Sequence, residues 1–234
     1  MPEAMFITAG IIKLLKALHD HRIAARDLRP ENIMIKKDGY LALHKLCASK
    51  LMPKKRSDFE YTTLIGTPHY MAIEMIKKEN YTFAVDYWSL GIILYELLTG
   101  IVPFGESVED PLEVYEAILF GHLEFPPLHK TSTFEKANSL ISQLLVKDQH
   151  KRSAGGWEAI ESHKLFAEFD WAEFNRKQMD SPAHEWTFLS DHDAKAKKLM
   201  GNHSKNFKPI VDPKDFEGID ESMPEWQKFL EQCI

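Results

Sequence analysis

The segment from Asp86 to Thr99 constrains the fold of this chain more than any other. Its sequence, DYWSLGIILYELLT, places apolar side chains on every side of a helix, and Gly100 follows directly as a residue that ends helices. A helix with one face in water would instead carry a polar stripe along that face. We therefore expect a helix that is buried all round, at the centre of a mostly helical domain.

Other segments predict a set of amphipathic helices and one small β-hairpin around this central helix. Apolar residues recur at helical spacing in 5–20, and Asp38-Gly39 separates two short apolar strands. The prolines and glycine between 44 and 70 indicate a long loop. The predicted elements are a helix over 5–20, a hairpin of 32–36 and 40–43, a helix begun by Asp110-Pro111 and ended by Gly121, a helix capped by Ser132 and Glu135, and a short helix near 157–165.

Composition excludes several classes of protein. The 234 residues carry a net charge of −6, which argues against nucleic acid as a partner, and no apolar run is long enough for a membrane span. The cysteines, Cys47 and Cys233, are too few for a disulfide framework or a thiolate metal site. The histidines lack metal-ligand spacing, so we predict no metal site and interpret His19 as an ordinary loop or surface residue. Because residues 1–6 do not resemble a secretory signal, we expect a cytoplasmic protein.

Four motifs follow one another in a distinctive order. They are ARDLRPEN at 25–32, GTPHYMAIE at 66–74, VDYWSLG at 85–91, and Lys151-Arg152. In order and spacing they closely resemble the eukaryotic protein kinases, and their wording is most similar to the cyclic-nucleotide-dependent serine/threonine kinases of the AGC group. The resemblance implies a helical kinase C-lobe over residues 1–169 and an AGC-type C-terminal tail over 170–234.

The resemblance assigns roles to the first motif. Asp27 stands at the position of the catalytic base, Asn32 at a position that helps to hold Mg²⁺, and Arg29 replaces the usual catalytic-loop lysine. Asp27 is also compatible with a purely structural role, in which its carboxylate binds neighbouring groups of the loop.

The position of the second metal ligand has changed. Where the family has Asp-Phe-Gly after the second strand of the hairpin, this chain has Lys45-Leu46-Cys47. A charge pair at contact is worth about 4 kcal/mol at an effective dielectric constant near 20, so a lysine in place of a carboxylate turns attraction for Mg²⁺ into repulsion. We therefore do not expect an ordinary Mg²⁺–ATP site.

Further matches concern regulation and stability. Thr63 matches the activation-loop phosphorylation threonine, with Arg26 as its nearest cation, but we interpret it as an unmodified loop threonine, because an inactive kinase has little need of the switch. Asp86 matches the residue that ties down the catalytic loop. Glu74 and Arg152 match a buried structural ion pair.

Two acidic residues, Glu31 and Glu96, match positions that face basic substrates in this kinase group. His69 stands where the family usually has another glutamate, a change that weakens the resemblance of the substrate groove. We interpret Glu31 and Glu96 as surface or packing residues.

The region 170–234 contains four prolines and weak periodicity, which predict an extended tail with local helix near 193–200 and 225–232. Trp226 and Phe229 near its end resemble the hydrophobic motif that family members insert into an N-lobe pocket. We expect this pair either to pack on the C-lobe or to be covered by a partner protein.

The resulting prediction is a pseudokinase. The sequence contains no Gly-x-Gly-x-x-Gly loop and no Val-Ala-x-Lys strand, which in the family belong to the N-lobe. We therefore expect no N-lobe, no catalysis and no cofactor. We expect instead a role as a scaffold for other protein subunits in a cytoskeletal or ciliary assembly. The alternative is a kinase half that uses ATP and Mg²⁺ when another chain supplies the N-lobe. A third interpretation is that Met1 is not the true start and that an N-lobe precedes it.

Overall fold

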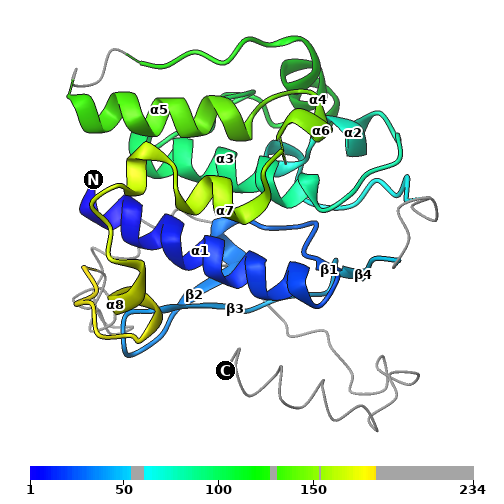
Figure 1. The fold of residues 1–234 in the computed structure, drawn as a ribbon. Coiled ribbons are helices and arrows are strands. Elements are labelled where there is room, and N and C mark those ends of the chain that lie inside the picture. The colour runs from blue at the N-terminus through cyan, green and yellow to red at the C-terminus, as the bar shows by residue number, and fades with distance from the viewer. Residues whose placement is uncertain (54–60, 127–130, 153, 183–234) are drawn as a thin grey trace, which may run out of the picture.

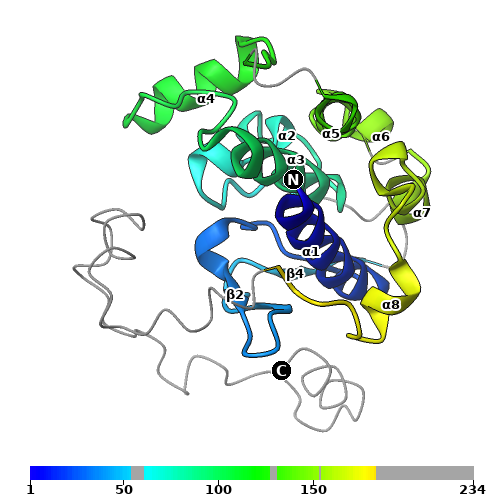
Figure 2. The same ribbon diagram turned by 90° about the vertical axis from the view of Figure 1, so that its left-hand side faces the viewer.

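The computed structural model describes residues 1–53, 61–126, 131–152 and 154–182. At its centre lies α3 (Ala84–Thr99), which packs between α1 (Pro2–Asp20) and α5 (Ser132–Leu144), as Figures 1 and 2 show. Every residue of α3 from Ala84 to Tyr95 is buried, and Gly100 ends the helix in the left-handed conformation at φ 78°. The predicted central helix is therefore present.

Close contact between α3 and α5 depends on a glycine. A Cβ atom at Gly91 would lie 2.8 Å from a methyl carbon of Leu145 and 2.9 Å from Cβ of Leu144. Real Cβ atoms do not approach carbon this closely, so the missing side chain lets the two helices meet.

Two small antiparallel sheets lie beside the helices. The predicted hairpin forms from β2 (Ile33–Ile35) and β3 (Leu41–Leu43), with Met34 opposite Ala42, on the far side of α1 from α3 (Figure 1). The second sheet joins β1 (Ile23–Ala24) to β4 (Lys50–Leu51). The prediction of a long loop over 44–70 is thus wrong at β4. This strand has only two residues, and its partner β1 lies about 27 positions earlier, so the sequence shows no alternating pattern there.

The remaining elements are short helices and two longer helices that begin with side-chain caps. Asp110 caps α4 (Pro111–Phe120) by accepting the Leu112 amide at 2.8 Å. The cap of α5 is Thr131 and not the predicted Ser132, because Thr131 is extended and accepts the Phe134 amide while Ser132 is already helical. The other elements are η1 (Pro30–Asn32), η3 (Pro68–Tyr70), α2 (Ile73–Ile76), α6 (Gln149–Arg152), α7 (Gly156–Glu161), η4 (Lys164–Phe166) and α8 (Trp171–Asn175).

The predicted helix near 157–165 is divided in two. His163 adopts an extended conformation after α7, and its Nδ1 accepts the Leu165 amide at 3.1 Å to begin η4. Residues beyond 169 also join the packed domain. The ring of Phe174 in α8 is 1% exposed and lies 5.1 Å from Phe6 and 5.3 Å from Tyr40, centre to centre. The helices predicted near 193–200 and 225–232 lie outside the described residues.

None of the helices in the described ranges is both long and apolar enough to cross a lipid bilayer.

Candidate functional site

The loop that leads to Asn32 is fixed by Asp86, in the first turn of α3. The Asp86 carboxylate is fully buried and accepts the backbone amides of Ala25 and Arg26, both at 2.8 Å. Arg26 has a positive φ of 63°, an unusual conformation for a residue with a side chain. The buried carboxylate therefore holds the chain in a shape that would not persist by itself.

His19 also binds Asp86, which corrects the expectation of a loop or surface residue. Its Nε2 lies 2.8 Å from Asp86 Oδ2, and its side chain is only 7% exposed. No local pattern in the sequence indicates this contact, because the two residues are 67 positions apart. The hydrogen bonds of Asp86 with His19 and with the two backbone amides thus join α1, the loop and α3.

Asp27 lies at the centre of a hydrogen-bonded cluster. Thr67 Oγ1 donates to Asp27 Oδ1 at 2.9 Å, and Asn32 Nδ2 donates to Asp27 Oδ2 at 3.1 Å and to the Asp27 carbonyl at 2.8 Å. The family resemblance groups Asp27 with Asn32 but does not indicate Thr67 as a partner of Asp27. Together Thr67 and Asn32 set the orientation of the Asp27 carboxylate.

A glycine permits the approach of Thr67. Gly66 has φ 117°, and a Cβ atom there would lie 2.9 Å from the Arg26 carbonyl oxygen. Only glycine adopts this conformation readily and leaves room for the neighbouring loop.

Arg29 stands close to two carboxylates. Its Nε lies 4.0 Å from Asp27 Oδ2 and 3.8 Å from Glu31 Oε2. Nε itself is buried without a hydrogen-bond partner in the described part of the chain. Arg29 therefore acts on Asp27 by charge, at the longest distance that still counts as an ion pair.

The position next to Asn32 decides whether the cluster can hold a metal ion. Asn32 Oδ1 is buried and has no hydrogen-bond partner among the described residues, as suits an oxygen awaiting a cation. The His44 amide donates to the Asn32 carbonyl at 2.8 Å, so the half-buried Lys45 follows directly after the residue that pairs with Asn32. No group of three or more histidine, cysteine or acidic side chains in the described ranges could hold a metal. One amide oxygen without a group of acidic ligands around it does not make a Mg²⁺ site, and the residues present do not fit that ion.

Glu74 and Arg152, which the sequence predicted as a pair, form two hydrogen bonds. The Arg152 guanidinium donates to Glu74 Oε1 at 2.7 Å and to Oε2 at 3.1 Å. It also donates to the Ala84 carbonyl at 3.0 Å and lies over the Trp88 ring at 4.9 Å. Because Arg152 is fully buried and Glu74 is 2% exposed, the pair joins α2 to α6 in the interior.

Arg26 and Thr63 are not joined by any hydrogen bond in the described part of the chain. The Arg26 guanidinium donates to the Ala48 carbonyl at 2.6 Å and to the Tyr81 hydroxyl at 2.8 Å. Thr63 is exposed, so a modifying enzyme could reach it.

A second acidic cluster lies near Arg29. The Tyr70 hydroxyl donates to Glu96 Oε2 at 2.7 Å. Burial raises the pKa of Glu96, the Tyr70 hydrogen bond opposes this rise, and the negative charge of Glu31 adds to it. His69 binds the Gly105 carbonyl at 3.0 Å. Glu31 and Glu96 thus lie close enough to influence each other, and Glu96 has a packing partner in Tyr70.

Comparison with known proteins identifies the family of these motifs. The family model described as "Protein kinase domain" matches residues 1–166. The chain belongs to the protein kinase family. The cGMP-dependent protein kinase of Eimeria tenella is 38% identical over 184 residues, which cover 77% of this kinase-family chain and 17% of the relative.

Other relatives are also AGC-type kinases. The cGMP-dependent protein kinase of Plasmodium berghei is 34% identical over 219 residues, which are 92% of this chain and 24% of the relative. The cAMP-dependent protein kinase catalytic subunit 3 of Drosophila melanogaster is 33% identical over 219 residues, which are 91% of this chain and 35% of the relative. The chain thus spans about a third or less of the length of these relatives.

Because the pKa of Glu96 is raised, we predict that the stability of this kinase-family domain depends on pH. Because the folded state favours protonated Glu96, it binds more protons than the unfolded state once the pH exceeds the ordinary value of 4.5, and stability falls as the pH rises through this window. Glu96→Gln keeps an oxygen for Tyr70 and removes this titration. We expect urea unfolding at pH 4.5 and pH 7 to show less loss with pH in the variant. The gain at pH 7 should stay below about 1 kcal/mol, because a half-exposed carboxylate is screened by water. If the free energies of unfolding of the variant and the wild type differed by the same amount at both pH values, the prediction would be contradicted.

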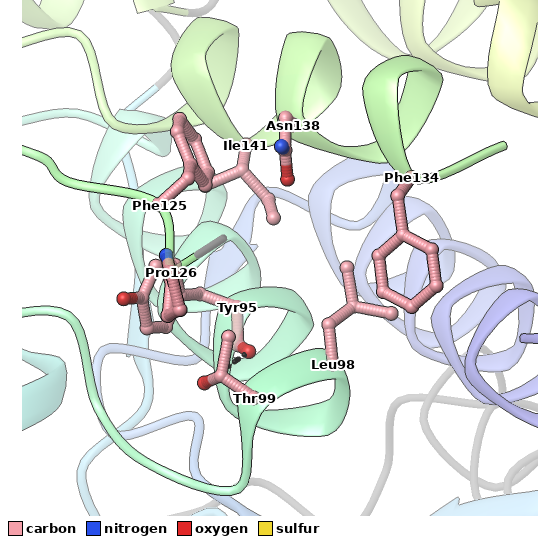
Figure 3. Close-up of a pocket in the computed structure, with 8 residues that line it drawn as sticks. All are labelled: Tyr95, Leu98, Thr99, Phe125, Pro126, Phe134, Asn138 and Ile141. Carbon is pink, nitrogen blue, oxygen red and sulfur yellow. Dashed lines mark hydrogen bonds between the residues drawn. The ribbon is translucent and has the colours of Figure 1, made fainter. Parts of the chain in front are cut away.

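A pocket at the end of α3 offers no alternative site for a nucleotide. Figure 3 shows its eight lining side chains, among them Tyr95 and Leu98 of α3, Phe125, and Phe134 and Ile141 of α5. Its cavity volume of about 10 Å³ is room for about one water molecule. The pocket is a packing defect between α3 and α5.

Trp226 and Phe229, the predicted partner-binding pair, lie outside the described residues.

Proposed function

We propose that this kinase-family chain is a catalytically inactive pseudokinase that serves as an interaction subunit of a larger assembly. The observation that carries the proposal is Lys45, a cation one residue beyond the hairpin partner of Asn32, at the position where the family resemblance calls for a metal-binding carboxylate. Phosphoryl transfer depends on metal ions to neutralise the phosphates. A positive side chain in place of a metal-binding carboxylate opposes metal binding and with it phosphoryl transfer.

The interaction role has support of a different kind. The hydrogen bonds that stabilise the domain, those of Asp86 with its loop and of Glu74 with Arg152, are all formed, so the domain can present a stable surface. Helix α4 carries large apolar side chains in water, with Leu112 69% and Phe120 76% exposed. Exposed apolar groups on one short helix are typical of a surface that contacts another protein.

The proposed domain plan divides the chain into a kinase C-lobe over 1–169 and a tail over 170–234. The family match over residues 1–166 is consistent with the first part. For the second part we propose that a protein partner, in a cytoplasmic and cytoskeletal or ciliary assembly, covers Trp226 and Phe229. Comparing the proteins that co-purify with wild type and with a Trp226→Ala/Phe229→Ala variant tests this proposal, and unchanged co-purification would contradict it.

Inactivity is tested by direct assay. Purified protein is incubated with Mg²⁺, γ-labelled ATP and a basic serine peptide, beside an Asp27→Ala variant. We expect the same background incorporation from both. Transfer by the wild type that Asp27→Ala abolishes would disprove the proposal, whereas transfer present in both would indicate a contaminating kinase and would require repurification.

A second candidate, a kinase half that needs an N-lobe from another chain, is favoured by one observation. Asp27 is held by Thr67 and Asn32 with its carboxylate oriented, as a working catalytic loop would require. ATP-dependent thermal stabilisation of the chain together with an N-lobe-bearing partner would support this candidate. The pseudokinase proposal expects no such stabilisation.

A further inference from the structure

A hollow of about 430 Å³ opens between α1, the start of α3 and α7. Its volume falls in the range of sites that take small ligands or single side chains. None of its lining residues belongs to the Asp27 cluster, and neither of the functions proposed above makes use of it.

One wall of the hollow is aromatic. The rings of Tyr87 and Trp157 are stacked, with centres 4.2 Å apart and planes 16° from parallel. The His19 ring lies 5.1 Å from Trp157 and 4.7 Å from the half-buried Phe83. Tyr87 and Trp157 are only 5% and 6% exposed, so the half-buried Phe83 offers more accessible aromatic surface than either, and such surface favours a flat or cationic group over a strongly hydrated anion.

The charges around the hollow are unbalanced. Lys16 is neutralised by Glu161, whose carboxylate oxygens lie 3.0 Å and 3.1 Å from its Nζ. The exposed carboxylates of Asp20 and Glu158 have neither a hydrogen bond nor an ion pair within the described ranges. Two negative charges therefore remain beside the aromatic wall.

The pKa of Tyr87 reflects the same excess of negative charge around the hollow. Its pKa is raised first by burial and then by the negative charges of Glu158, Asp86 and Asp20. Asp86 is already occupied by His19 and two backbone amides. The fields of carboxylates from α1, α3 and α7 thus converge on the hollow, and those of Asp20 and Glu158 are available to a ligand.

We propose that this hollow binds an arginine side chain of a partner protein. A guanidinium group is planar, so it lies flat on aromatic surface while its N–H groups reach carboxylates at the edge. It supplies the positive charge that Asp20 and Glu158 lack. The proposal extends the interaction role and does not depend on catalytic inactivity, so a positive kinase assay would leave it standing.

The first test uses N-acetyl-arginine methylamide as the probe, with the neutral citrulline analogue of the same shape as its control. Binding to the whole chain is followed by ¹H–¹⁵N NMR. We expect saturable shifts of the Trp157 indole and of the Asp20 and Phe83 amides, with a dissociation constant on the order of 1 mM for a ligand of about 16 non-hydrogen atoms. The citrulline probe should bind at least fivefold more weakly.

The second test uses two variants that remove the same number of charges. Asp20→Asn/Glu158→Gln should weaken binding of the arginine probe about tenfold, as expected for the loss of two half-exposed charge pairs. Glu113→Gln/Glu116→Gln removes two exposed carboxylates from α4 and should leave binding unchanged. Because all four side chains are exposed, neither variant endangers folding.

Several results would overturn the proposal. These are no saturable binding, equal binding of the two probes, equal weakening in both variants, or shifts confined to the neighbourhood of Glu31 and Glu96. The last result would show that arginine prefers the other acidic cluster of the domain.

Discussion

Replacing Glu74 with glutamine should lower the free energy of unfolding by about 3–5 kcal/mol, because it leaves the Arg152 charge buried without its counterion. Arg152 is fully buried, and its two hydrogen bonds to Glu74, at 2.7 Å and 3.1 Å, are the contacts that neutralise it. Glutamine can accept only one of them and carries no charge. Urea unfolding followed by circular dichroism measures the loss.

A matched control for this substitution lies on the same part of the chain. Glu79 faces Lys77 at 3.9 Å, and both side chains are about half exposed. Glu79→Gln should therefore change stability by less than about 0.5 kcal/mol. Equal losses in Glu74→Gln and Glu79→Gln would show that Arg152 finds other compensation and would contradict the structural role of the pair.

The second large effect concerns Asp86. An asparagine at this position can accept one of the two backbone amides, but its own NH₂ group then points at the other, so one buried donor is left without an acceptor. The interaction with His19 Nε2 at 2.8 Å also loses its charge. We expect Asp86→Asn to cost about 2–4 kcal/mol of stability.

Hydrogen exchange locates this loss. The amides of Ala25 and Arg26 should exchange faster in Asp86→Asn than expected from the drop in global stability, because the positive φ of Arg26 needs the carboxylate to hold it. Asp110→Asn is the control, since asparagine caps a helix about as well as aspartate and Asp110 lies at the surface. Protection of Ala25 and Arg26 that survives Asp86→Asn would disprove the anchoring role of Asp86.

Local signals in the sequence were sufficient for the elements that they describe. The all-round apolar pattern before Gly100 predicted α3, Asp38-Gly39 predicted the β2–β3 hairpin, and Asp110-Pro111 predicted the start of α4. Each depends on neighbouring residues only. The error at the start of α5, where Thr131 and not Ser132 is the cap, arose because two adjacent residues offered the same hydroxyl.

Contacts between distant parts of the chain could not be predicted from the sequence unless the family resemblance indicated them. The resemblance named Glu74 and Arg152 as partners, and they lie in contact across 78 positions. It did not name His19 as a partner of Asp86 or Thr67 as a partner of Asp27. Strand β4 was missed for the same reason, because its pairing with β1 leaves no local pattern.

The sequence by itself determined the helical character of this protein, its kinase-type motifs and the lysine at the position where the family resemblance calls for a metal-binding carboxylate. These follow from residue type and spacing, which need no coordinates. Only the tertiary structure decided that the buried Asn32 Oδ1 has no hydrogen-bond partner in the described part of the chain, that His19 binds Asp86, and that Asp20 and Glu158 line one hollow. The physical reason is that the partners of a buried polar group, or the walls of a hollow, come from segments that packing alone brings together.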